Sequence, residues 1–345
     1  MRTLSMVAAA WLALLSLTAC DNTATQNSAG EVNLYSSRHY DTDLALYDDF
    51  TRDTGIQVNR IEAGADELIA RIQSEGESSP ADLLITVDAG RLWRAEQAGI
   101  FQAVDSVVLT ERLPDNMRHP EGLWIGLSKR ARVIVYNREA GLPTPLADYT
   151  DLADPTHAGK VCIRSSSNIY NVSLMASIVA HLGEAAAELW AEGVVRNFAR
   201  TPQSNDTGQI RAVASGECQI AVVNTYYLAR LAASDDPADL AVAAAVGIVF
   251  PGQQGNGTHV NISGAGVVST SPNRDNAIRF LEYLTSDRAQ SLFADGNNEY
   301  PAVPSVGASS NVAALGEFKE EGLNSAEFGV YQETAIMGFD CAGWQ

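Results

Sequence analysis

Four of the 11 tyrosines lie where they could act together on one ligand. Each follows a run of residues that favours a β-strand, and each precedes or opens a predicted helix. In an open α/β sheet, ligands bind beyond the carboxyl ends of the strands, so we expect these side chains to meet in one cleft. They are Tyr40, Tyr170, Tyr226 and Tyr227, after predicted strands at 32–36, 160–164 and 219–223.

Phenolate oxygens would make this cluster a site for a trivalent metal ion. A tyrosine side chain has an ordinary pKa of about 10, so a phenolate ligand at neutral pH needs a strong cation beside it. A hard, oxygen-seeking ion such as Fe3+ meets that need, because metal binding drives deprotonation of the ligands. Arg230 follows the tyrosine pair by three and four residues. On a helix it would share their face and offset the negative charge.

Packing is the commoner explanation of such tyrosines. Their rings often line cores and clefts, with the hydroxyl making one hydrogen bond. A cluster without a metal would not be unusual in a chain with 11 tyrosines. The residue pattern alone leaves both interpretations open.

The elements that would position these side chains are strands and helices in alternation. Segments 32–36, 56–61 and 82–87 have the composition of strands, and helical patterns follow each of them. The last, DLLITV, is almost continuously apolar, as in a strand buried on both faces. Such alternation predicts a doubly wound α/β sheet. Helix capping is the role expected of Asp41, Asp43, Asp66 and Asp88.

A second series of strands and helices begins near residue 132 and predicts a second lobe. We therefore expect two doubly wound α/β lobes joined by crossing strands, with a cleft between them. The first lobe is assigned to 31–129 plus 261–310, and the second to 130–260 plus 311–345.

Five segments occur in the order in which a known family has them. They are 36–40 (SSRHY), 80–92 (PADLLITVDAGRL), 164–171 (RSSSNIYN), 224–227 (NTYY) and 298–301 (NEYP). Together they resemble the ferric iron-binding periplasmic proteins of bacterial ABC importers. The similarity extends over about residues 31 to 345.

This resemblance implies a hinged, type II periplasmic binding protein that carries Fe3+ to an inner-membrane permease and is not an enzyme. The ligands implied by the matching motifs are Tyr40, Tyr170, Tyr226 and Tyr227, with His39 as a possible fifth. Because no tyrosine of the set is replaced, we expect no obligatory synergistic anion such as carbonate or phosphate. A monomer in the periplasm is expected.

The amino terminus has the pattern of an export signal. Arg2 precedes an apolar stretch at 6–19, which is shorter than the roughly 20 residues that cross a bilayer. The sequence LTAC at 17–20 resembles the bacterial lipobox, so Cys20 would be lipidated after removal of residues 1–19. Residues 20–30 are small and polar and predict a flexible tether. We expect attachment to the membrane only through this lipid anchor.

Export also permits disulfides. With Cys20 assigned to lipid, three of the four cysteines remain. Cys162 and Cys218 each begin a predicted strand of the second lobe, and neighbouring parallel strands would place them within bridging reach. We expect a disulfide between these two and a free Cys341; three buried thiols are the alternative.

Charge and motifs disfavour several other functions. The chain has 42 acidic and 23 basic residues and a formal charge of -19, which repels nucleic-acid backbones. The sequence contains no H-E-x-x-H, P-loop or G-x-S-x-G motif. Two alternatives to an iron carrier remain. One is a binding protein for an organic cation such as a polyamine, and the other is a secreted α/β hydrolase with an unrecognised site.

Overall fold

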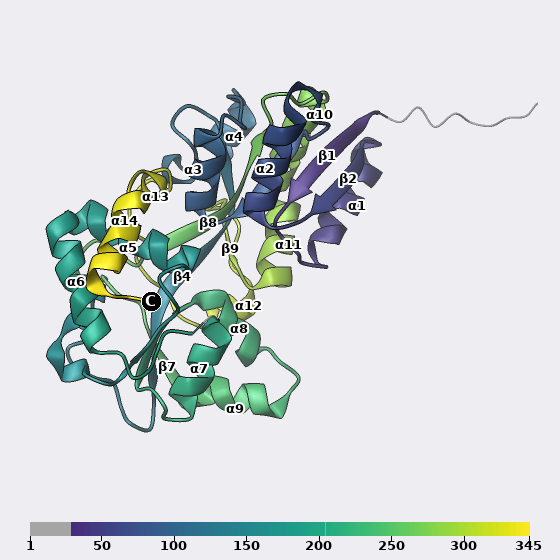
Figure 1. Cartoon of the computed structure of the whole chain (residues 1–345). Coiled ribbons are helices and arrows are strands. Elements are labelled where there is room, and N and C mark those ends of the chain that lie inside the picture. Colours follow the sequence, from purple (N-terminus) through teal and green to yellow (C-terminus); the bar gives the residue numbers. More distant parts are fainter. Residues whose placement is uncertain (1–28, 204) are drawn as a thin grey trace, which may run out of the picture.

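A mixed sheet of nine strands runs through two lobes of the molecule (Figure 1). The computed structural model describes residues 29–203 and 205–345. Along the sheet the strand order is β2-β1-β3-β8-β4-β6-β5, and β7 and β9 also pair with β4. The first lobe contains three parallel strands: β1 (Glu31–Ser36), β2 (Gln57–Glu62) and β3 (Leu83–Val87).

One long strand connects the lobes. β4 (Ile125–Asn137) pairs with β8 (Val260–Val267) along its first half. Its second half pairs with β6 (Ile220–Asn224) and β7 (Val246–Val249) of the second lobe. All of these pairings are antiparallel, as is that between β8 and β3, so the crossing strands interrupt the parallel order expected from the sequence. Nearly every residue of β4 is buried because elements cover both of its faces.

Helices of the first lobe cover its sheet. The first of them, α1, ends at Gly55, whose positive φ of 74° is readily adopted by glycine, as its position after the helix predicted. Phe50 and Phe280 pack with ring centroids 4.8 Å apart in the core between α1 and α10. The helices are α1 (Asp43–Thr54), α2 (Ala65–Glu75), α3 (Ala89–Gln97), α4 (Val107–Arg112), α10 (Arg274–Leu284) and α11 (Asp287–Asn297).

The second lobe is built around β5 (Val161–Cys162) and β6, which are parallel. The carboxyl-terminal helix packs against α5 and α6 (Figure 1). Trp344, just after it, contacts the rings of Trp190 and Phe339. The helices are α5 (Ile169–Leu182), α6 (Glu184–Arg196), α7 (Asp206–Ala214), α8 (Thr225–Ala232), α9 (Pro237–Ala245), α12 (Ser310–Ala313), α13 (Glu327–Val330) and α14 (Gln332–Ala342).

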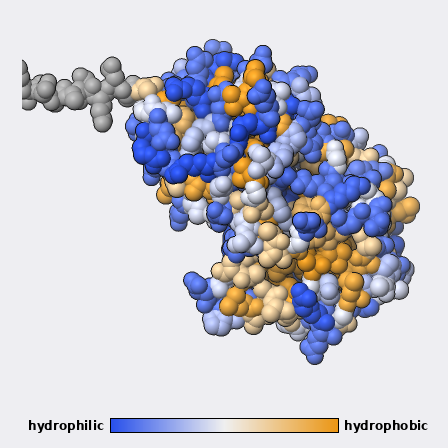
Figure 2. Space-filling model, turned by 180° about the vertical axis from the view of Figure 1, so that it is seen from behind, coloured by the Kyte–Doolittle hydropathy of each residue, from blue (hydrophilic) through white to orange (hydrophobic). Residues whose placement is uncertain are grey.

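Short elements complete the fold. The strand β9 (Tyr300–Pro301) pairs with β4. The 3₁₀ helices are η1 (Gly76–Ser78), η2 (Asp115–Met117), η3 (Tyr149–Ala153) and η4 (Pro155–His157). In the described part of the chain, no helix is both long and apolar enough to cross a membrane. Figure 2 shows the face opposite to that of Figure 1, with a mostly hydrophilic upper part and hydrophobic residues gathered on the lower part.

Only some of the acidic residues expected to cap helices do so. Asp88 caps α3, where its carboxylate accepts a hydrogen bond from Gly90 N at 2.9 Å. Asp66 does not cap α2, because the helix begins one residue earlier and Asp66 falls in its first turn. The expected capping role of Asp43 was also wrong: its buried carboxylate accepts a hydrogen bond from Arg38 Nε at 2.8 Å.

Two glycines of β8 allow the close approach of neighbouring chains that the sequence predicted. A Cβ on Gly266 would lie 2.5 Å from both Leu123 O and a ring carbon of Phe101. We expect Gly266→Ala to lower the free energy of unfolding by about 1–3 kcal/mol, because the strands cannot move apart without breaking their hydrogen bonds.

Chemical denaturation of Gly266→Ala beside Gly307→Ala measures this effect. A Cβ on Gly307 would meet nothing within 4 Å, so this control should unfold like the unsubstituted chain. Equal stability of the two variants would contradict the packing described for β8.

Candidate metal centre

The four tyrosines gather between the lobes. The Tyr226 hydroxyl donates a hydrogen bond to the Tyr170 hydroxyl at 3.4 Å. The rings of Tyr226 and Tyr227 lie with centroids 4.2 Å apart. Tyr40 comes from the other lobe. It lies near enough to Tyr170 for that charge to raise the pKa of Tyr40, and near enough to Tyr226 for the charge of Tyr40 to raise the pKa of Tyr226. The structure therefore brings together the four hydroxyl groups that the sequence predicted to meet.

Strand ends and helix starts place these side chains. Tyr170 is the second residue of α5, whose cap residue Asn168 accepts a hydrogen bond from Tyr170 N at 3.2 Å. Tyr226 and Tyr227 are the second and third residues of α8, which begins directly after β6. The first turn of α8 has no side-chain cap. Its Thr225 hydroxyl instead accepts a hydrogen bond from Ala131 N of the crossing strand at 3.2 Å.

Burial raises the pKa of three of these tyrosines. Desolvation is the main cause that raises the pKa of Tyr226 well above its usual value, and the neighbouring tyrosines raise it further. Desolvation, then the Glu299 carboxylate, raises the pKa of Tyr40 to about 12. The pKa of Tyr227 is also raised, first by burial and then by Tyr170. A cation that binds here must therefore displace phenol protons.

Arginines surround the tyrosine rings. The guanidinium carbon of Arg38 lies 4.8 Å from the ring centroid of Tyr40. Those of Arg130 and Arg164 each lie 5.5 Å from the centroid of Tyr170. Arg230 lies 5.8 Å from Tyr226 and 6.0 Å from Tyr227, on the helical face predicted for it, but its side chain is exposed.

Arg130 is the cation that sequence reasoning missed. It is buried on β4, and its Nη1 donates a hydrogen bond to Ser263 Oγ of β8 at 2.9 Å. Its Nε and Nη2 have no hydrogen-bond partner among the described residues. The charge of Arg130 lowers the pKa of Tyr226 against the dominant effect of burial. Basic residues at alternate positions of an apolar strand, as in Arg130 and Arg132, were the signal in the sequence.

Buried acids lie beside Arg38 and Arg132, and the Glu299 carboxylate is also 3.8 Å from Arg130 Nη1. Arg38 Nη1 lies 3.1 Å from the Glu299 carboxylate, in addition to its contact with Asp43. Arg132 Nη1 donates to Asp206 Oδ2 at 2.8 Å, and its Nη2 donates to Asn171 Oδ1 at 2.8 Å. Asn171 is the residue after Tyr170, so its hydrogen bond with Arg132 fixes the start of α5, while Asp206 balances the charge of Arg132.

Of the other predicted residues, one lies apart from this cluster and one lies outside the described part of the chain. His39 is exposed and its Nδ1 lies 3.6 Å from the Glu62 carboxylate, so the structure pairs it with an acid of β2. Cys20, the predicted lipidation site, lies outside the described residues. Within those residues, no group of three or more His, Cys, Asp or Glu side chains could hold a metal ion.

Most of the chain matches a known protein family. Residues 78–319 match the model of a family described as bacterial extracellular solute-binding protein. The chain belongs to this family. Solute-binding proteins of this kind include iron uptake protein A1 of Synechocystis, 52% identical over 321 residues, which make up 93% of this chain and 89% of that protein. Iron uptake protein A2 of the same organism is 54% identical over 316 residues, or 91% of this chain and 90% of that protein.

Solved structures of solute-binding proteins have the same fold. A Trichodesmium protein, IdiA (FutA), in complex with iron and citrate, has a TM-score of 0.89 and 55% identity over 92% of this chain and 100% of its own. The ferric binding protein of Campylobacter jejuni has a TM-score of 0.85 and 37% identity over 91% of this chain and 100% of its own. The two-lobed fold predicted from the sequence is confirmed by these relatives.

The raised tyrosine pKa values predict how the metal-free protein responds to base. A group whose pKa is raised by folding stabilises the fold below its unfolded pKa, here about 10, and loses that contribution as the pH rises toward the folded pKa. We expect the melting temperature of the metal-free protein to fall between about pH 10 and pH 12. Absorbance at about 295 nm should show the buried tyrosines ionising above the exposed ones.

The Tyr226→Phe variant is the control for this titration, since it removes one of the buried hydroxyls and keeps its ring. Its stability should fall less steeply with pH. A single tyrosine titration centred at about pH 10 in the folded protein would contradict the burial described here.

Proposed function

We propose that the protein is the substrate-binding component of a ferric iron ABC importer and that it binds Fe3+ through Tyr40, Tyr170, Tyr226 and Tyr227. The observation that carries this proposal is the meeting of four tyrosine side chains between two lobes, with Tyr226 buried and the other three half-buried. The names of the relatives support it, since they are an iron uptake protein and a ferric binding protein. The sequence resemblance pointed to the same function.

The charges of the site suit a trivalent ion. Four phenolates around Fe3+ leave one unit of negative charge, which a buried arginine can offset. Arg130 has the best position for this role, because it is buried, has two nitrogens without partners among the described residues, and faces Tyr170. Arg230 would contribute from the more exposed side of the tyrosine pair.

The proposed ligand set needs no further anion to be complete. Relatives that lack a tyrosine of the set can add a synergistic anion, but all four tyrosines are present here. Citrate accompanies iron in the Trichodesmium relative. We expect the protein to bind Fe3+ when citrate and carbonate are withheld, and binding that requires either anion would contradict this part of the proposal. His39 is a weaker candidate for a fifth ligand because its exposed ring lies against Glu62.

Movement of the lobes would admit and release the ion. The proposed division assigns 31–129 and 261–310 to one lobe, and 130–260 and 311–345 to the other. Tyr40 then belongs to the first lobe, while the other tyrosines belong to the second. Rotation about β4 and β8, near 129–133 and 261–267, would separate Tyr40 from its partners. In this structure Tyr40 lies near enough to Tyr170 for the charge of Tyr170 to raise the pKa of Tyr40.

An importer implies an inner-membrane permease as the partner and the periplasm as the compartment. We further propose that Cys20 carries a lipid anchor, that residues 20–30 form a tether, and that the protein is a monomer. Membrane fractionation of the full chain and of Cys20→Ser separates an anchored from a free periplasmic form.

The two alternative functions receive less support. Membership of a solute-binding family favours a carrier over a hydrolase. A polyamine site would use aromatic walls and carboxylates to hold a cation. The cluster found here instead has arginines facing its tyrosine rings, and these would repel an organic cation.

Colour provides a direct test of the proposed ligands. Phenolate-to-iron charge transfer should make the Fe3+ form red-orange. Tyr226→Phe or Tyr227→Phe keeps the ring but removes an oxygen ligand, so we expect each to bleach the visible band and to weaken binding at least a hundredfold, or about 2.7 kcal/mol. Absorption spectra and competition with a chelator measure both effects.

His39→Ala is the matched control and should weaken binding less than about tenfold. Circular dichroism checks that each variant is folded. Folded Tyr226→Phe and Tyr227→Phe proteins with the colour and affinity of the unsubstituted chain would overturn the proposed site. A colourless iron mixture that nevertheless binds spermidine would favour the organic-cation alternative.

A further inference from the structure

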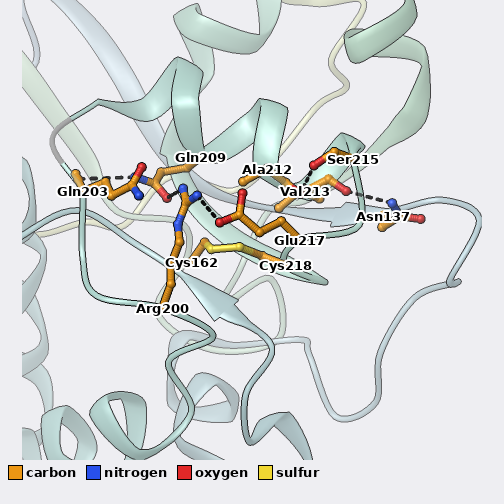
Figure 3. The surroundings of a disulfide bond; sticks show 10 residues. All are labelled: Asn137, Cys162, Arg200, Gln203, Gln209, Ala212, Val213, Ser215, Glu217 and Cys218. Carbon is orange, nitrogen blue, oxygen red and sulfur yellow. Dashed lines mark hydrogen bonds and ion pairs between the residues drawn. A yellow bond between two sulfur atoms is a disulfide. The ribbon is translucent and has the colours of Figure 1, made fainter.

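A disulfide joins the two strands that lead to three of the tyrosines. Cys162 is the last residue of β5, and Cys218 lies two residues before β6. Their Cα atoms are 5.8 Å apart, and both side chains are buried (Figure 3). This is the pair that the sequence predicted, and Cys341 is free and exposed.

The disulfide lies the same number of residues before Tyr170 as before Tyr226. Tyr170 follows Cys162 by eight residues, and Tyr226 follows Cys218 by eight. Since β5 and β6 are parallel, both segments run from the disulfide toward tyrosines at the same edge of the sheet, where the strands have their carboxyl ends. The disulfide therefore joins the starts of the two segments that lead to Tyr170 and to Tyr226.

One of these segments begins at the edge of the sheet, where hydrogen bonds to Arg164 O from Trp344 Nε1 at 3.0 Å and from Asn171 Nδ2 at 2.8 Å also hold it. β6 pairs with the crossing strand β4 at five positions, whereas β5 pairs with β6 at only two. On its other side β5 has a single bridge, from Val161 to Phe198. Residues 163–168, between β5 and α5, have no helix or strand. The disulfide thus ties a short edge strand to one that is firmly held in the sheet.

Hydrogen bonds also hold the turn that contains Cys218 against the rest of the second lobe. Cys218 N donates a hydrogen bond to Ala212 O of α7 at 3.2 Å. Arg200 Nη1 donates to Glu217 Oε1 at 2.6 Å, and its Nη2 donates to Gln209 Oε1 at 3.0 Å (Figure 3). The opposite end of α7 reaches the site, where Asp206 Oδ2 accepts from Asn224 N at 2.8 Å. A shift of Cys162 relative to Cys218 would therefore move Tyr170 relative to a fixed tyrosine pair.

We propose that the Cys162–Cys218 disulfide positions Tyr170 against Tyr226 and Tyr227, so that the metal affinity depends on the oxidation state of the two cysteines. The inference rests on the proposed function. Reduction by a dithiol breaks the sulfur–sulfur bond. Two electrons and two protons convert the cysteines to thiols, while the dithiol is oxidised to its own disulfide. Metal affinity is then lower in the reduced protein.

Coupling between two equilibria is reciprocal, which gives the proposal a second observable. If the disulfide strengthens metal binding by a given factor, the bound metal stabilises the disulfide against reduction by the same factor. For this two-electron couple, a tenfold change in affinity corresponds to about 30 mV in the reduction potential. A disulfide that only restrains the unfolded chain would not produce this shift.

The test uses the full chain with Cys20→Ser and Cys341→Ser, which leaves the two bridged cysteines as the only thiols. Ga3+, supplied as citrate, replaces Fe3+ because it is trivalent, binds phenolates and is not reduced by thiols. Tyrosine difference absorbance reports its binding. The disulfide midpoint is measured in dithiothreitol redox buffers, with and without saturating Ga3+, by alkylation and mass spectrometry. A second arm compares the same chain with and without Cys162→Ser and Cys218→Ser.

Two controls separate positioning from stability. Leu68→Ala opens a cavity in α2 of the other lobe, where Leu68 is buried, and should lower the melting temperature without a change in Ga3+ affinity. We expect the oxidised protein to bind Ga3+, the cysteine double variant to bind it at least about tenfold more weakly, and the midpoint to become more negative by about 30 mV or more with Ga3+.

Equal affinity of the oxidised protein and the folded cysteine variant would overturn the positioning role, while the proposed function would stand. If that variant does not fold, the midpoint arm decides, and an unshifted midpoint overturns the inference. Failure of the oxidised protein to bind Ga3+ and Fe3+ would overturn the proposed function together with this inference.

Discussion

The cost of forming phenolates inside the protein is the constraint on which the whole arrangement depends. Burial raises the pKa of Tyr40 and Tyr226, so the cluster stays neutral until a cation strong enough to displace the protons arrives. The same burial removes competing water, which strengthens the attraction between phenolate and metal once the ion is bound. A weakly charged ion could not offset the desolvation. Selectivity for a trivalent cation therefore follows from the same packing that makes the empty cluster resist ionisation.

The crossing strand β4 links this electrostatic balance to the hinge. Arg130 and Arg132 are two residues apart and share a face of the strand. Arg130 contacts Ser263 of the other crossing strand and faces Tyr170, while Arg132 binds Asp206 and the start of α5. In the proposed rotation of the lobes, Arg132 would move together with Asp206 and the start of α5, whereas Tyr40 would move relative to both.

The tyrosines could be found from the sequence because their role leaves a local pattern: each lies beyond a strand and at the start of a helix. The cysteine pair was also accessible, since both cysteines lie near the start of parallel strands. Arg130 and Arg132 left only the signal of basic residues in an apolar strand, and Arg38 left none, because a buried cation depends on partners far away in the chain. Arg38 needs Glu299, and no local rule predicts that pairing. Capping by Asp43 failed for a different reason: the buried guanidinium of Arg38, only five residues away, outcompeted the helix end for its carboxylate.

Proton release on metal binding tests the central claim most directly. Unbuffered protein near pH 7 is titrated with ferric nitrilotriacetate, and the base needed to hold the pH constant is recorded. The protons taken up by the freed chelator are added to this amount to give the protons released by the protein. If four neutral phenols become phenolates, about four protons are released for each Fe3+ bound. The Tyr226→Phe variant, at iron concentrations that still saturate it, should release about one fewer. Release of one proton or none would mean that carboxylates or neutral groups hold the ion, and would contradict a ferric-phenolate centre.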